Sequence, residues 1–283
     1  MDPKNKKIKI LRIIARLNIG GPAIHVINLT HYLNDEQFES KLICGQEAAH
    51  EGNMLHLAEE KNVHPIVIPE LGREISILKD FKIIWKLYKI IRQEKPDIVH
   101  THTAKAGTVG RIAAKLAGIK TIIHTFHGHV LHSYFGKLKT FFFIQIERFL
   151  ALLTDKIVVI SEQQKKELVH YKIAAEDKFL VIPLGFELDK YKNLKRTNYL
   201  RNLFNIPDNT KLIGIIGRLT PIKNHQLLIP IMQEVLARFK EPVKLVVVGS
   251  GELESELKAL VNKHHLEKEI LFTGWHKDLT QIY

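Results

Sequence analysis

A glycine and two basic side chains follow a short apolar run in the last third of the chain. Gly217 ends the run Leu212–Ile216. Arg218 comes directly after the glycine, and Lys223 stands five residues further on. Where a buried strand stops and turns into a helix, free backbone N–H groups and the helix dipole point at one spot. Two cations there suit a diphosphate, so the segment predicts a diphosphate site; the alternative is a plain turn with solvated side chains.

Two neighbouring features extend this predicted site. We expect the side chain of Asn224 to cap a helix that contains Leu228. A second strand end in the same part of the chain carries Gly249 and Gly251. Glycines at such a turn let the backbone wrap around a phosphate or a base. One small turn of this kind is weak evidence, but together with Gly217 it indicates a nucleotide site.

A third glycine turn, Gly20-Gly21, follows the first apolar run of the chain. Pro22 suits the first turn of a helix that would start there. Open α/β sheets bind ligands at the carboxyl ends of their parallel strands, which is where this turn would lie. The dinucleotide fingerprint Gly-x-Gly-x-x-Gly is absent. The turn is therefore either a ligand-binding loop or a tight connection without further function.

Several histidines are predicted to gather at the same edge of the first sheet. His127 is followed by Gly128 at the end of one strand-like run, and His100 and His102 close the preceding run on one strand face. The glycine neighbour makes His127 the best candidate for a hydrogen-bonding residue of an active site. No carboxylate ligand stands nearby and the spacing fits no metal triad, so we predict no metal site.

The predicted helix Phe135–Leu153 mixes aromatic and basic side chains. Its first half contains Lys137, Lys139 and Phe141–Phe143. Such a helix can lie at a membrane interface. In the alternative reading it packs into the core with Glu147 and Arg148 facing outward. A second surface of the same kind is expected around Lys82, Lys86 and Lys89.

Composition narrows the possible classes of protein. The 283 residues are 45% hydrophobic and 25% charged, enough for two globular domains. A single cysteine excludes a disulfide framework and favours a reducing cytoplasm. The net charge of +12 indicates an anionic partner. Because zinc-finger spacings and basic-aromatic RNA motifs are missing, we expect a nucleotide ligand and an anionic membrane surface rather than nucleic acid. The predicted location is the cytoplasm, with peripheral attachment to the inner face of the membrane.

Strand-like and helix-like runs alternate along the chain, which predicts a doubly wound α/β protein. The strands expected in the first half are Ile8–Ala15, Phe38–Cys44, His64–Ile68, Asp97–Thr101, Thr121–Thr125, Lys156–Ile160 and Phe179–Ile182. The helices between them are Ala23–Leu33, Gly52–Lys61, Leu78–Arg92, Ala104–Ala117, Phe135–Leu153 and one from Ser161. They predict one complete Rossmann-like domain over residues 1–190, with a mostly parallel sheet of seven strands.

The predicted organisation of the rest is a linker over residues 191–210 and a partial second domain over residues 211–283. Its strands start at Leu212, cover Val243–Val248 and Ile270–Phe272, and a helix is expected at Asp278–Tyr283. Three strands and two helices cannot bury both faces of a parallel sheet. We therefore expect the second domain to be incomplete and the chain to be a shortened form of a longer protein.

Taken together, these segments resemble the family-four retaining glycosyltransferases, which have two Rossmann-like domains of the GT-B type. In the first domain the matching segments are Gly20-Gly21, Asp97–His102, Thr125–Gly128, Val159–Glu162 and Val181–Phe186. In the second they are Gly217–Leu219, Lys223-Asn224, Val248–Gly251 and Phe272–Trp275. The match runs in order over essentially the whole chain.

The resemblance implies a sugar transferase of envelope polysaccharide or glycolipid synthesis. It implies an acceptor, a glycan or a lipid-linked sugar, bound mainly by the first domain, and a nucleotide-diphosphate sugar bound mainly by the second. Arg218 and Lys223 would stabilise the leaving diphosphate, the Gly20-Gly21 loop would close on the same phosphates, and His127 would contact the transferred sugar. The family keeps the anomeric configuration and needs neither metal nor cofactor. A uridine diphosphate sugar is expected on family frequency, with guanosine diphosphate mannose second.

One family element is missing from the sequence. A Glu-x₇-Glu segment, which in the family grips the sugar and the ribose, would follow the position at which this chain stops. Two other functions therefore stay open: a non-catalytic module that binds carbohydrate or nucleotide sugar, and a non-hydrolysing UDP-sugar epimerase. The epimerase would need an acid–base pair of carboxylates, and none stands beside Gly20-Gly21 or His127.

Overall fold

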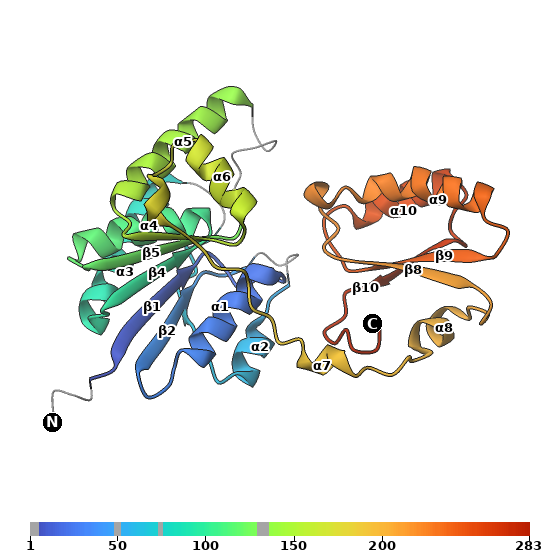
Figure 1. Ribbon diagram of the computed structural model, residues 1–283, viewed down its shortest axis with the longest axis horizontal. Helices are drawn as coiled ribbons and strands as arrows, with labels where there is room; N and C mark the ends of the chain where they lie inside the picture. The colour runs from blue at the N-terminus through green and yellow to red at the C-terminus, as the bar shows by residue number, and fades with distance from the viewer. Residues whose placement is uncertain (1–5, 48–51, 73–75, 129–135) are drawn as a thin grey trace. The chain divides into compact units, whose positions relative to one another are not determined.

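The computed structural model of the protein describes residues 6–47, 52–72, 76–128 and 136–283. The chain divides into two compact units, Met1–Phe186 (unit 1) and Glu187–Tyr283 (unit 2), each of which is described by itself (Figure 1). Among the described helices, none combines the length and the apolar character that a membrane crossing requires.

Unit 1 is built on a sheet of seven parallel strands in the order β3-β2-β1-β4-β5-β6-β7. The strands are β1 (Ile8–Ile14), β2 (Phe38–Cys44), β3 (Ile66–Val67), β4 (Ile98–His102), β5 (Thr121–Phe126), β6 (Lys156–Val159) and β7 (Phe179–Val181). The order runs outward from β1 in both directions, so the topological switch point lies between β1 and β4. The expected seven-stranded parallel sheet is confirmed.

Helices cover both faces of this sheet. They are α1 (Gly21–Tyr32), α2 (Leu55–Glu60), α3 (Ile77–Glu94), α4 (Ala104–Leu116), α5 (Lys137–Leu152) and α6 (Glu162–His170), and a 3-10 turn, η2 (Glu176–Lys178), precedes β7. On one face α1 and α2 pack on Ile14, Leu42 and Cys44. On the opposite face α3 and α4 pack on Leu11, Ile13 and Val99, and α5 and α6 continue that layer.

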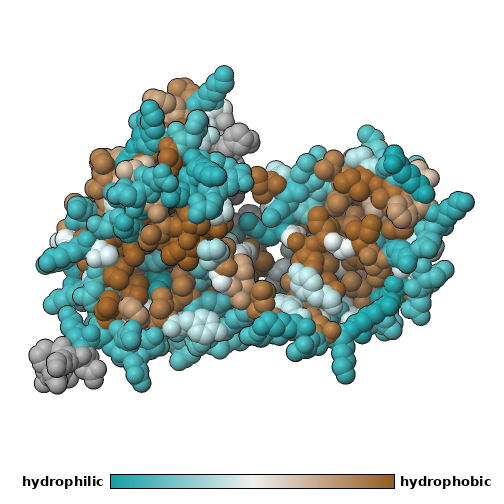
Figure 2. Space-filling view, in the orientation of Figure 1, coloured by the Kyte–Doolittle hydropathy of each residue, from teal (hydrophilic) through white to brown (hydrophobic). Residues whose placement is uncertain are grey.

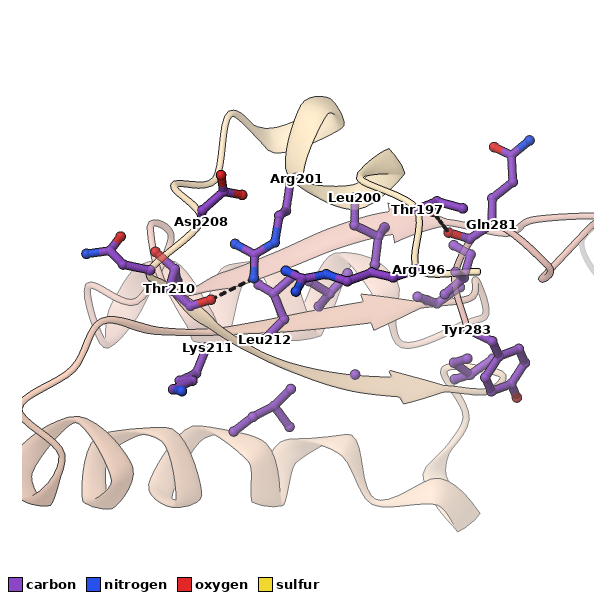
Figure 3. A pocket seen from close by; sticks show the side chains of 17 residues that line it. Arg196, Thr197, Leu200, Arg201, Asp208, Thr210, Lys211, Leu212, Gln281 and Tyr283 are labelled. Atoms are coloured by element: carbon purple, nitrogen blue, oxygen red, sulfur yellow. Dashed lines mark hydrogen bonds between the residues drawn. The ribbon is translucent and has the colours of Figure 1, made fainter. Parts of the chain in front are cut away.

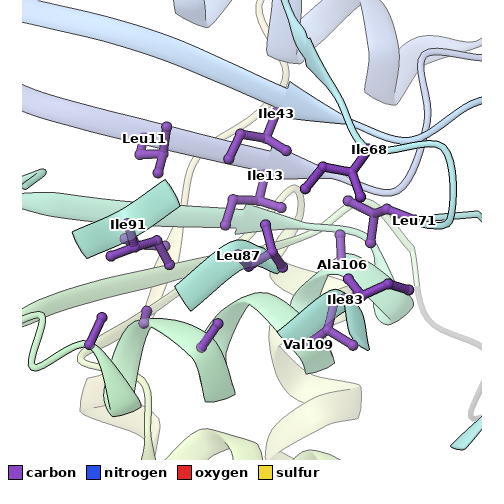
Figure 4. Close-up of a cluster of buried hydrophobic side chains, with 14 of the residues drawn as sticks. Leu11, Ile13, Ile43, Ile68, Leu71, Ile83, Leu87, Ile91, Ala106 and Val109 are labelled. Carbon is purple, nitrogen blue, oxygen red and sulfur yellow. The ribbon is translucent and has the colours of Figure 1, made fainter. Parts of the chain in front are cut away.

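The largest core of unit 1 lies under α3 and α4. Ile83 and Leu87 from α3 and Val109 from α4 close over the strand residues Leu11 and Ile13 (Figure 4). All five side chains are at most 2% exposed. Burying one such side chain stabilises the fold by about 1.5–3 kcal/mol. This core fixes the positions of β1 and β4, whose carboxyl ends carry the candidate residues.

Unit 2 contains three parallel strands in the order β10-β9-β8. They are β8 (Lys211–Ile216), β9 (Val243–Val248) and β10 (Ile270–Gly274). The helices are α7 (Asp189–Lys192), α8 (Tyr199–Phe204), α9 (Leu228–Arg238) and α10 (Glu254–Lys263), with two 3-10 turns, η3 (Pro221–Lys223) and η4 (His225–Leu227). α9 and α10 cover one face of the sheet. Ile213 and Ile216 of β8 are 42% and 37% exposed.

Most expected helices and strands begin and end within three residues of the observed bounds. For β2 and β9 both bounds are the expected ones. Phe135, the expected first residue of one helix, lies outside the described residues. The expected helix Asp278–Tyr283 is wrong, because the segment forms a turn in which Ile282 and Tyr283 donate to the carbonyl of Leu279. The Asp278 carboxylate accepts from the N–H of Thr280 and stabilises that turn.

Two further expectations are corrected by the structure. Asn224 does not cap a helix; it adopts a left-handed conformation, with φ 49°, between η3 and η4, and α9 begins only at Leu228. Asparagine tolerates this conformation better than most residues. Glu147 does not face outward, because it is 7% exposed and forms an ion pair of 2.8 Å with the fully buried Arg111 of α4.

Candidate functional site

The first candidate region is the amino end of α1, directly after β1. α1 starts at Gly21 with Pro22 in its first turn, as expected, and its N-cap residue, Gly20, has no side chain that could bond to the first N–H groups. A Cβ atom built on Gly20 or Gly21 would meet nothing closer than 3.8 Å. The two glycines are therefore not forced by crowding; they leave open space beside a helix amino terminus, where an anion is favoured.

Four histidines meet beside this helix, on the sheet face that α1 covers. His100 and His102 lie on β4, as expected on one strand face, and His25 comes from α1. The ring centroids of His25 and His127 are 5.4 Å apart, and those of His100 and His102 are 4.1 Å apart. Nδ1 of His102 lies 3.0 Å from Nε2 of His127, so the two rings share a hydrogen bond. The structure thus brings His127 and the start of α1 to one edge of the sheet.

The histidines are held neutral. Burial lowers the pKa of His127 to about 4, and the nearby His25 adds to the effect. Burial also puts the pKa values of His100 and His102 well below the usual range, with smaller contributions from neighbouring charged groups. The guanidinium of Arg12 on β1 is one of these charges; it is 1% exposed and its Nη1 donates to Oγ of Ser40. Neutral imidazoles suit hydrogen bonding to an uncharged ligand such as a sugar hydroxyl.

A strained residue follows His102. Thr103 has φ 66° and ψ 158°, a backbone region that is otherwise almost confined to glycine. Its carbonyl accepts from the N–H of Gly107, which starts α4 directly after β4. Strain of this kind costs about 1–3 kcal/mol and is concentrated at functional sites. It marks the end of β4 as a position where the backbone is held in one conformation.

The second candidate region lies at the carboxyl end of β8 in unit 2. Arg218 and Lys223 are both exposed, and neither forms an ion pair with another residue of the described chain. The N–H groups of Arg218, Ser250 and Gly251 donate to no other described residue. Two unpaired cations and free N–H groups at adjacent strand ends are the components of an anion site.

The glycines of the β9 turn have a packing role. A Cβ on Gly249, whose φ is 139°, would lie 2.1 Å from the carbonyl oxygen of Gly217. A Cβ on Gly251 would lie 2.4 Å from the carbonyl oxygen of Leu219. Hydrogen bonds from Gly217 N–H to Val248 and from Leu219 N–H to Ser250 join the same two turns. The β8 and β9 turns therefore interlock and form one rigid surface.

Comparison with known proteins identifies the family. The family model described as Glycosyltransferase Family 4 matches residues 19–190, and the model described as Glycosyl transferases group 1 matches residues 198–283. The chain belongs to this glycosyltransferase family. It is 30% identical over 285 residues to the UDP-Gal:alpha-D-GlcNAc-diphosphoundecaprenol alpha-1,3-galactosyltransferase of Escherichia coli, with all of this chain and 72% of that enzyme aligned.

A further relative is named for polysaccharide synthesis. This chain is 32% identical over 200 residues to the capsular polysaccharide biosynthesis glycosyltransferase CapM of Staphylococcus aureus, and the alignment covers 68% of this chain and 50% of that protein. Among solved structures, Anabaena HepE in complex with UDP and glucose matches with a TM-score of 0.76 at 19% identity, over 97% of this chain and 71% of HepE. The fold is therefore the GT-B arrangement of two Rossmann-like domains that the sequence predicts.

A hollow of about 570 Å³ lies elsewhere in unit 2 of the glycosyltransferase. Figure 3 shows Leu212 of β8 in its wall, together with Arg196 and Arg201 from the segment before the strand. The guanidinium of Arg201 donates to the carbonyls of Pro207 and Thr210 and so is already occupied. None of the predicted site residues lines this hollow, and we do not assign the donor site to it.

The described residues contain no group of three histidine, cysteine or acidic side chains arranged to hold a metal ion. Three histidines of the cluster form side-chain hydrogen bonds: His102 and His127 bond to each other, and Nε2 of His100 lies 2.7 Å from Oγ1 of Thr125. The cluster is thus organised by hydrogen bonds among neutral groups.

The first half of α5 exposes most of the aromatic and basic surface that the sequence predicts, but Phe143 is partly buried and packs against a core cluster of unit 1. Phe141 and Phe142 are 60% and 63% exposed, so the reading in which this part of α5 packs into the core is wrong for them. Lys137 and Lys139 are exposed and form no ion pair with the rest of the described chain. Figure 2 shows hydrophobic and hydrophilic side chains side by side over this helix.

The lysines of α3 behave differently. Lys82 and Lys86 form ion pairs of 3.2 Å and 2.6 Å with the carboxylate of Glu70, and chiefly the hydrogen bond from Lys86 lowers the pKa of Glu70 to about 2. Nζ of Lys89 lies over the ring of Trp85. These charges are partly compensated within the protein, unlike those of α5.

Sequence reasoning missed three groups at the unit 1 site. His25 and Arg12 stand far from the His127 motif in the chain, and Thr103 is an ordinary residue type in a position normally taken by glycine. A signal existed for His25, because it lies one helical turn after the Gly20-Gly21 loop and so on a helix that starts at the ligand edge.

Proposed function

We propose that the protein transfers a sugar from a uridine diphosphate sugar to a glycan or lipid-linked acceptor, with retention of configuration, in envelope polysaccharide or glycolipid synthesis. The observation that carries the proposal is the pair of exposed cations Arg218 and Lys223, which form no ion pair within the described part of the chain and lie beside N–H groups that donate to no described residue, in a chain of this glycosyltransferase family. The name of the Escherichia coli relative, a galactosyltransferase acting on a diphosphoundecaprenol-linked sugar, supports a lipid-linked acceptor.

In the proposed reaction the bond between the anomeric carbon and the diphosphate oxygen breaks as the acceptor oxygen bonds to that carbon from the same face. The acceptor's proton passes to the leaving phosphate oxygen, so the configuration is retained and no further reactant is consumed. Negative charge grows on the leaving oxygen. Arg218 and Lys223, with the N–H groups of the Gly217 and Gly249–Gly251 turns, stabilise that charge. The positive charge comes from the protein, so the proposal requires neither a metal nor a cofactor.

We assign donor binding to unit 2 and acceptor binding to unit 1. Asn224 adjoins Lys223 and contributes to the donor site through its polar side chain. The Gly20-Gly21 turn offers open space to the phosphates, together with N–H groups that donate to no described residue, and His127 offers a neutral imidazole to a hydroxyl of the transferred sugar.

We further propose that unit 1 attaches peripherally to the inner face of the cytoplasmic membrane through α5. Lys137 and Lys139 would interact with anionic lipid headgroups, and Phe141 and Phe142 would enter the interfacial layer. This places the enzyme beside a lipid-linked acceptor.

The proposal is tested by a transfer assay with the purified protein. UDP-galactose, UDP-glucose, UDP-N-acetylglucosamine and GDP-mannose are offered with an N-acetylglucosamine-diphosphate lipid acceptor, and products are analysed by mass spectrometry. We expect transfer from one UDP-sugar, unchanged by a chelator, with an α-anomeric product by proton NMR. A β product would overturn retention, and loss of transfer in chelator would overturn the metal-free reaction.

The same assay separates the two alternatives. A donor that binds and is never consumed, with any acceptor, would indicate a binding module. Conversion of the free UDP-sugar into an epimer without an acceptor would indicate an epimerase; one structural neighbour at 16% identity is described as a putative UDP-N-acetylglucosamine 2-epimerase. Either result would replace the transferase proposal.

A further inference from the structure

The first half of α3 turns large apolar side chains toward solvent. Leu78, Phe81 and Trp85 are 84%, 68% and 57% exposed. They stand three and four residues apart in the sequence, and side chains at this spacing lie on one face of a helix. The core side of the same helix is a different one, where Ile83 and Leu87 are fully buried. The three exposed residues (the α3 line) therefore contribute little to the core of unit 1.

The ring of Trp85 is held in place although it is exposed. It stacks on the ring of Tyr88, with the centroids 5.3 Å apart and an angle of 14° between the planes. Nζ of Lys89 lies 5.3 Å from the centroid of the Trp85 ring. A tryptophan beside a lysine suits the boundary between lipid and water, where the ring is buried and the ammonium group stays hydrated. The α3 line thus has the side-chain chemistry of a helix that lies at an interface.

One helix, α4, joins α3 to α5. α3 packs against α4 and α4 packs against α5, so the three helices lie side by side on one face of the sheet (Figure 1). An ion pair stabilises each contact: Lys105 of α4 lies 2.7 Å from the carboxylate of Asp80 on α3, and Arg111 of α4 pairs with Glu147 of α5. The α3 line and the exposed side chains of α5 are therefore fixed relative to each other.

α3 and α5 both begin at the carboxyl edge of the sheet, which carries the candidate ligand residues. α3 follows β3 and α5 follows β5, and in a parallel sheet each connecting helix starts at that edge. The α3 line lies in the first half of α3, and the exposed Leu138, Phe141 and Phe142 lie in the first half of α5. At the opposite end of the layer, Leu116 and Leu152 are the exposed last residues of α4 and α5. A surface that touches the first halves of α3 and α5 is therefore next to the ligand edge.

The first halves of α3 and α5 carry surplus positive charge. Lys137 and Lys139 form no ion pair within the described chain. On α3, Lys82 and Lys86 share the single carboxylate of Glu70, which leaves one positive charge over. An anionic surface is attracted to such a region.

The opposite end of the helix layer suits an anionic surface less well. Leu152 lines a hollow together with the carboxylates of Asp155 and Asp177. The two lysines of this hollow, Lys156 and Lys178, already donate to backbone carbonyls. Because exposed apolar side chains occur at both ends, the charges beside them decide which end meets an anionic membrane.

We propose that unit 1 lies on an anionic bilayer with the first halves of α3 and α5 in contact with it, which brings the carboxyl edge of the sheet next to the membrane surface. This inference rests on the peripheral attachment proposed above and adds to it a second contact helix and an orientation. α5 contributes charge and aromatic rings, and the α3 line contributes apolar area whose burial salt does not screen. In this orientation a lipid-linked acceptor presents its sugar to the ligand edge while its lipid chain stays in the bilayer.

The fluorescence of Trp85 measures the contact of α3 with lipid. The chain has two tryptophans, so Trp275→Phe leaves Trp85 as the only one. The vesicles contain phosphatidylglycerol and a phosphatidylcholine brominated in its acyl chains, because bromine quenches a tryptophan that enters the bilayer. We expect the emission to shift to the blue and to be quenched on binding. Unshifted and unquenched emission from protein that co-sediments with the vesicles would overturn the proposal and leave attachment through α5 standing.

Two matched substitutions test the orientation. Phe81→Gln removes an apolar side chain from the α3 line, and Leu116→Gln removes one from the opposite end of the layer; the two positions are 68% and 65% exposed. Phe81→Gln should lower the partition coefficient onto anionic vesicles about tenfold, at low and at high salt alike, and Leu116→Gln should leave it unchanged. Equal losses in the two variants would overturn the orientation. Unchanged vesicle binding in Phe81→Gln would overturn the contact of α3 and indicate a protein partner for the α3 line instead.

An activity measurement separates this inference from the proposed function. Phe81→Gln should reduce sugar transfer to a lipid-linked acceptor in vesicles and leave transfer to a short-chain, water-soluble acceptor unchanged. Equal losses with both acceptors would contradict the orientation. If the wild type transfers no sugar to either acceptor, the proposed function fails, and the quenching of Trp85 still decides whether α3 enters the bilayer.

Discussion

The candidate residues at the carboxyl edges of the two sheets differ in both burial and charge. In unit 1 the candidate side chains are buried or half-buried, uncharged and bonded to one another, as in the His102–His127 pair. In unit 2 Arg218 and Lys223 are exposed cations that form no ion pair within the described chain. The difference matches the chemistry proposed for each unit, because sugar hydroxyls need oriented neutral partners and a diphosphate needs positive charge. We therefore expect the stability of unit 1 to depend on pH and on its internal packing. We expect sugar transfer to depend on the charges of unit 2.

The largest expected effect concerns buried charge. Arg111→Met leaves the carboxylate of Glu147 buried without a partner and should destabilise unit 1 by about 3–5 kcal/mol. Arg238→Met, which breaks an exposed pair with Glu234 in unit 2, should change stability by less than about 0.5 kcal/mol. Denaturant unfolding monitored by circular dichroism measures both. Replacing both partners, Arg111→Met with Glu147→Leu, should recover most of the lost stability. Equal losses of stability in Arg111→Met and Arg238→Met would contradict the proposed difference between buried charge in unit 1 and exposed charge in unit 2.

The second effect concerns turnover. Arg218→Ala and Lys223→Ala should each slow sugar transfer about a hundred- to a thousandfold, because each removes stabilisation of the leaving diphosphate. Donor affinity should fall much less, since the charge grows only as the bond breaks. Arg238→Ala is the control for removing an exposed arginine from unit 2. A loss of transfer rate below about fivefold for either variant would contradict the diphosphate site and indicate that Gly217–Asn224 is a plain turn. His127→Ala should instead disturb the positioning of the sugar.

The third effect is acid sensitivity of unit 1. Well above pH 6.5 His127 is neutral whether folded or unfolded. As the pH falls from 6.5 toward 4, the unfolded chain binds a proton that the folded His127, with its pKa of about 4, does not. The free energy of unfolding should therefore fall by about 3 kcal/mol from this residue alone. Unfolding curves at several pH values measure the slope, and His127→Asn should reduce it by the contribution of this residue, while His100 and His102 keep the rest. A stability independent of pH between 6.5 and 4 would contradict the neutral cluster.

The smallest effect concerns the surface of α5. Lys137→Ala and Lys139→Ala should each weaken binding to anionic vesicles by about 1 kcal/mol at low salt, and high salt should reduce the difference. Lys82→Ala with Lys86→Ala is the matched pair, and it should weaken binding less because Glu70 already compensates those charges. Co-sedimentation measures binding. Equal losses for the two pairs, or equal binding to neutral vesicles, would contradict the assignment to α5.

The sequence predicts long buried elements well and local contacts poorly. β2 and β9 both have the expected bounds; for β9 the reason is its mostly apolar run Val243–Val248, because such a run between turn residues is a strong strand signal. The helix at Asp278–Tyr283 was wrong because so short a segment is decided by local hydrogen bonds, here those of Asp278 and Leu279. Glycine turns and cations were placed at strand ends by the α/β alternation alone.

Partnerships across the fold could not be predicted. His102 and His127 are 25 residues apart, and Arg111 and Glu147 are 36 apart. Their contacts follow from strand register and from helices that cross the sheet, which no local pattern encodes. The packing role of Gly249 was equally hidden, since its close neighbour is a carbonyl of the β8 turn. Sequence patterns indicated the edge of the sheet on which each candidate residue lies. Which side chains contact one another could be seen only in the structure.

The most direct test of the central claim is a titration of the ¹⁵N-labelled protein with UDP, followed through its backbone amide signals. If unit 2 binds the donor diphosphate at the interlocked β8 and β9 turns, the largest shifts should fall on Gly217, Arg218 and Gly249–Gly251. They should saturate, and they should weaken in the double variant Arg218→Ala with Lys223→Ala. Saturable shifts confined to unit 1, or to the hollow beside Leu212 and Arg201, would contradict the claim.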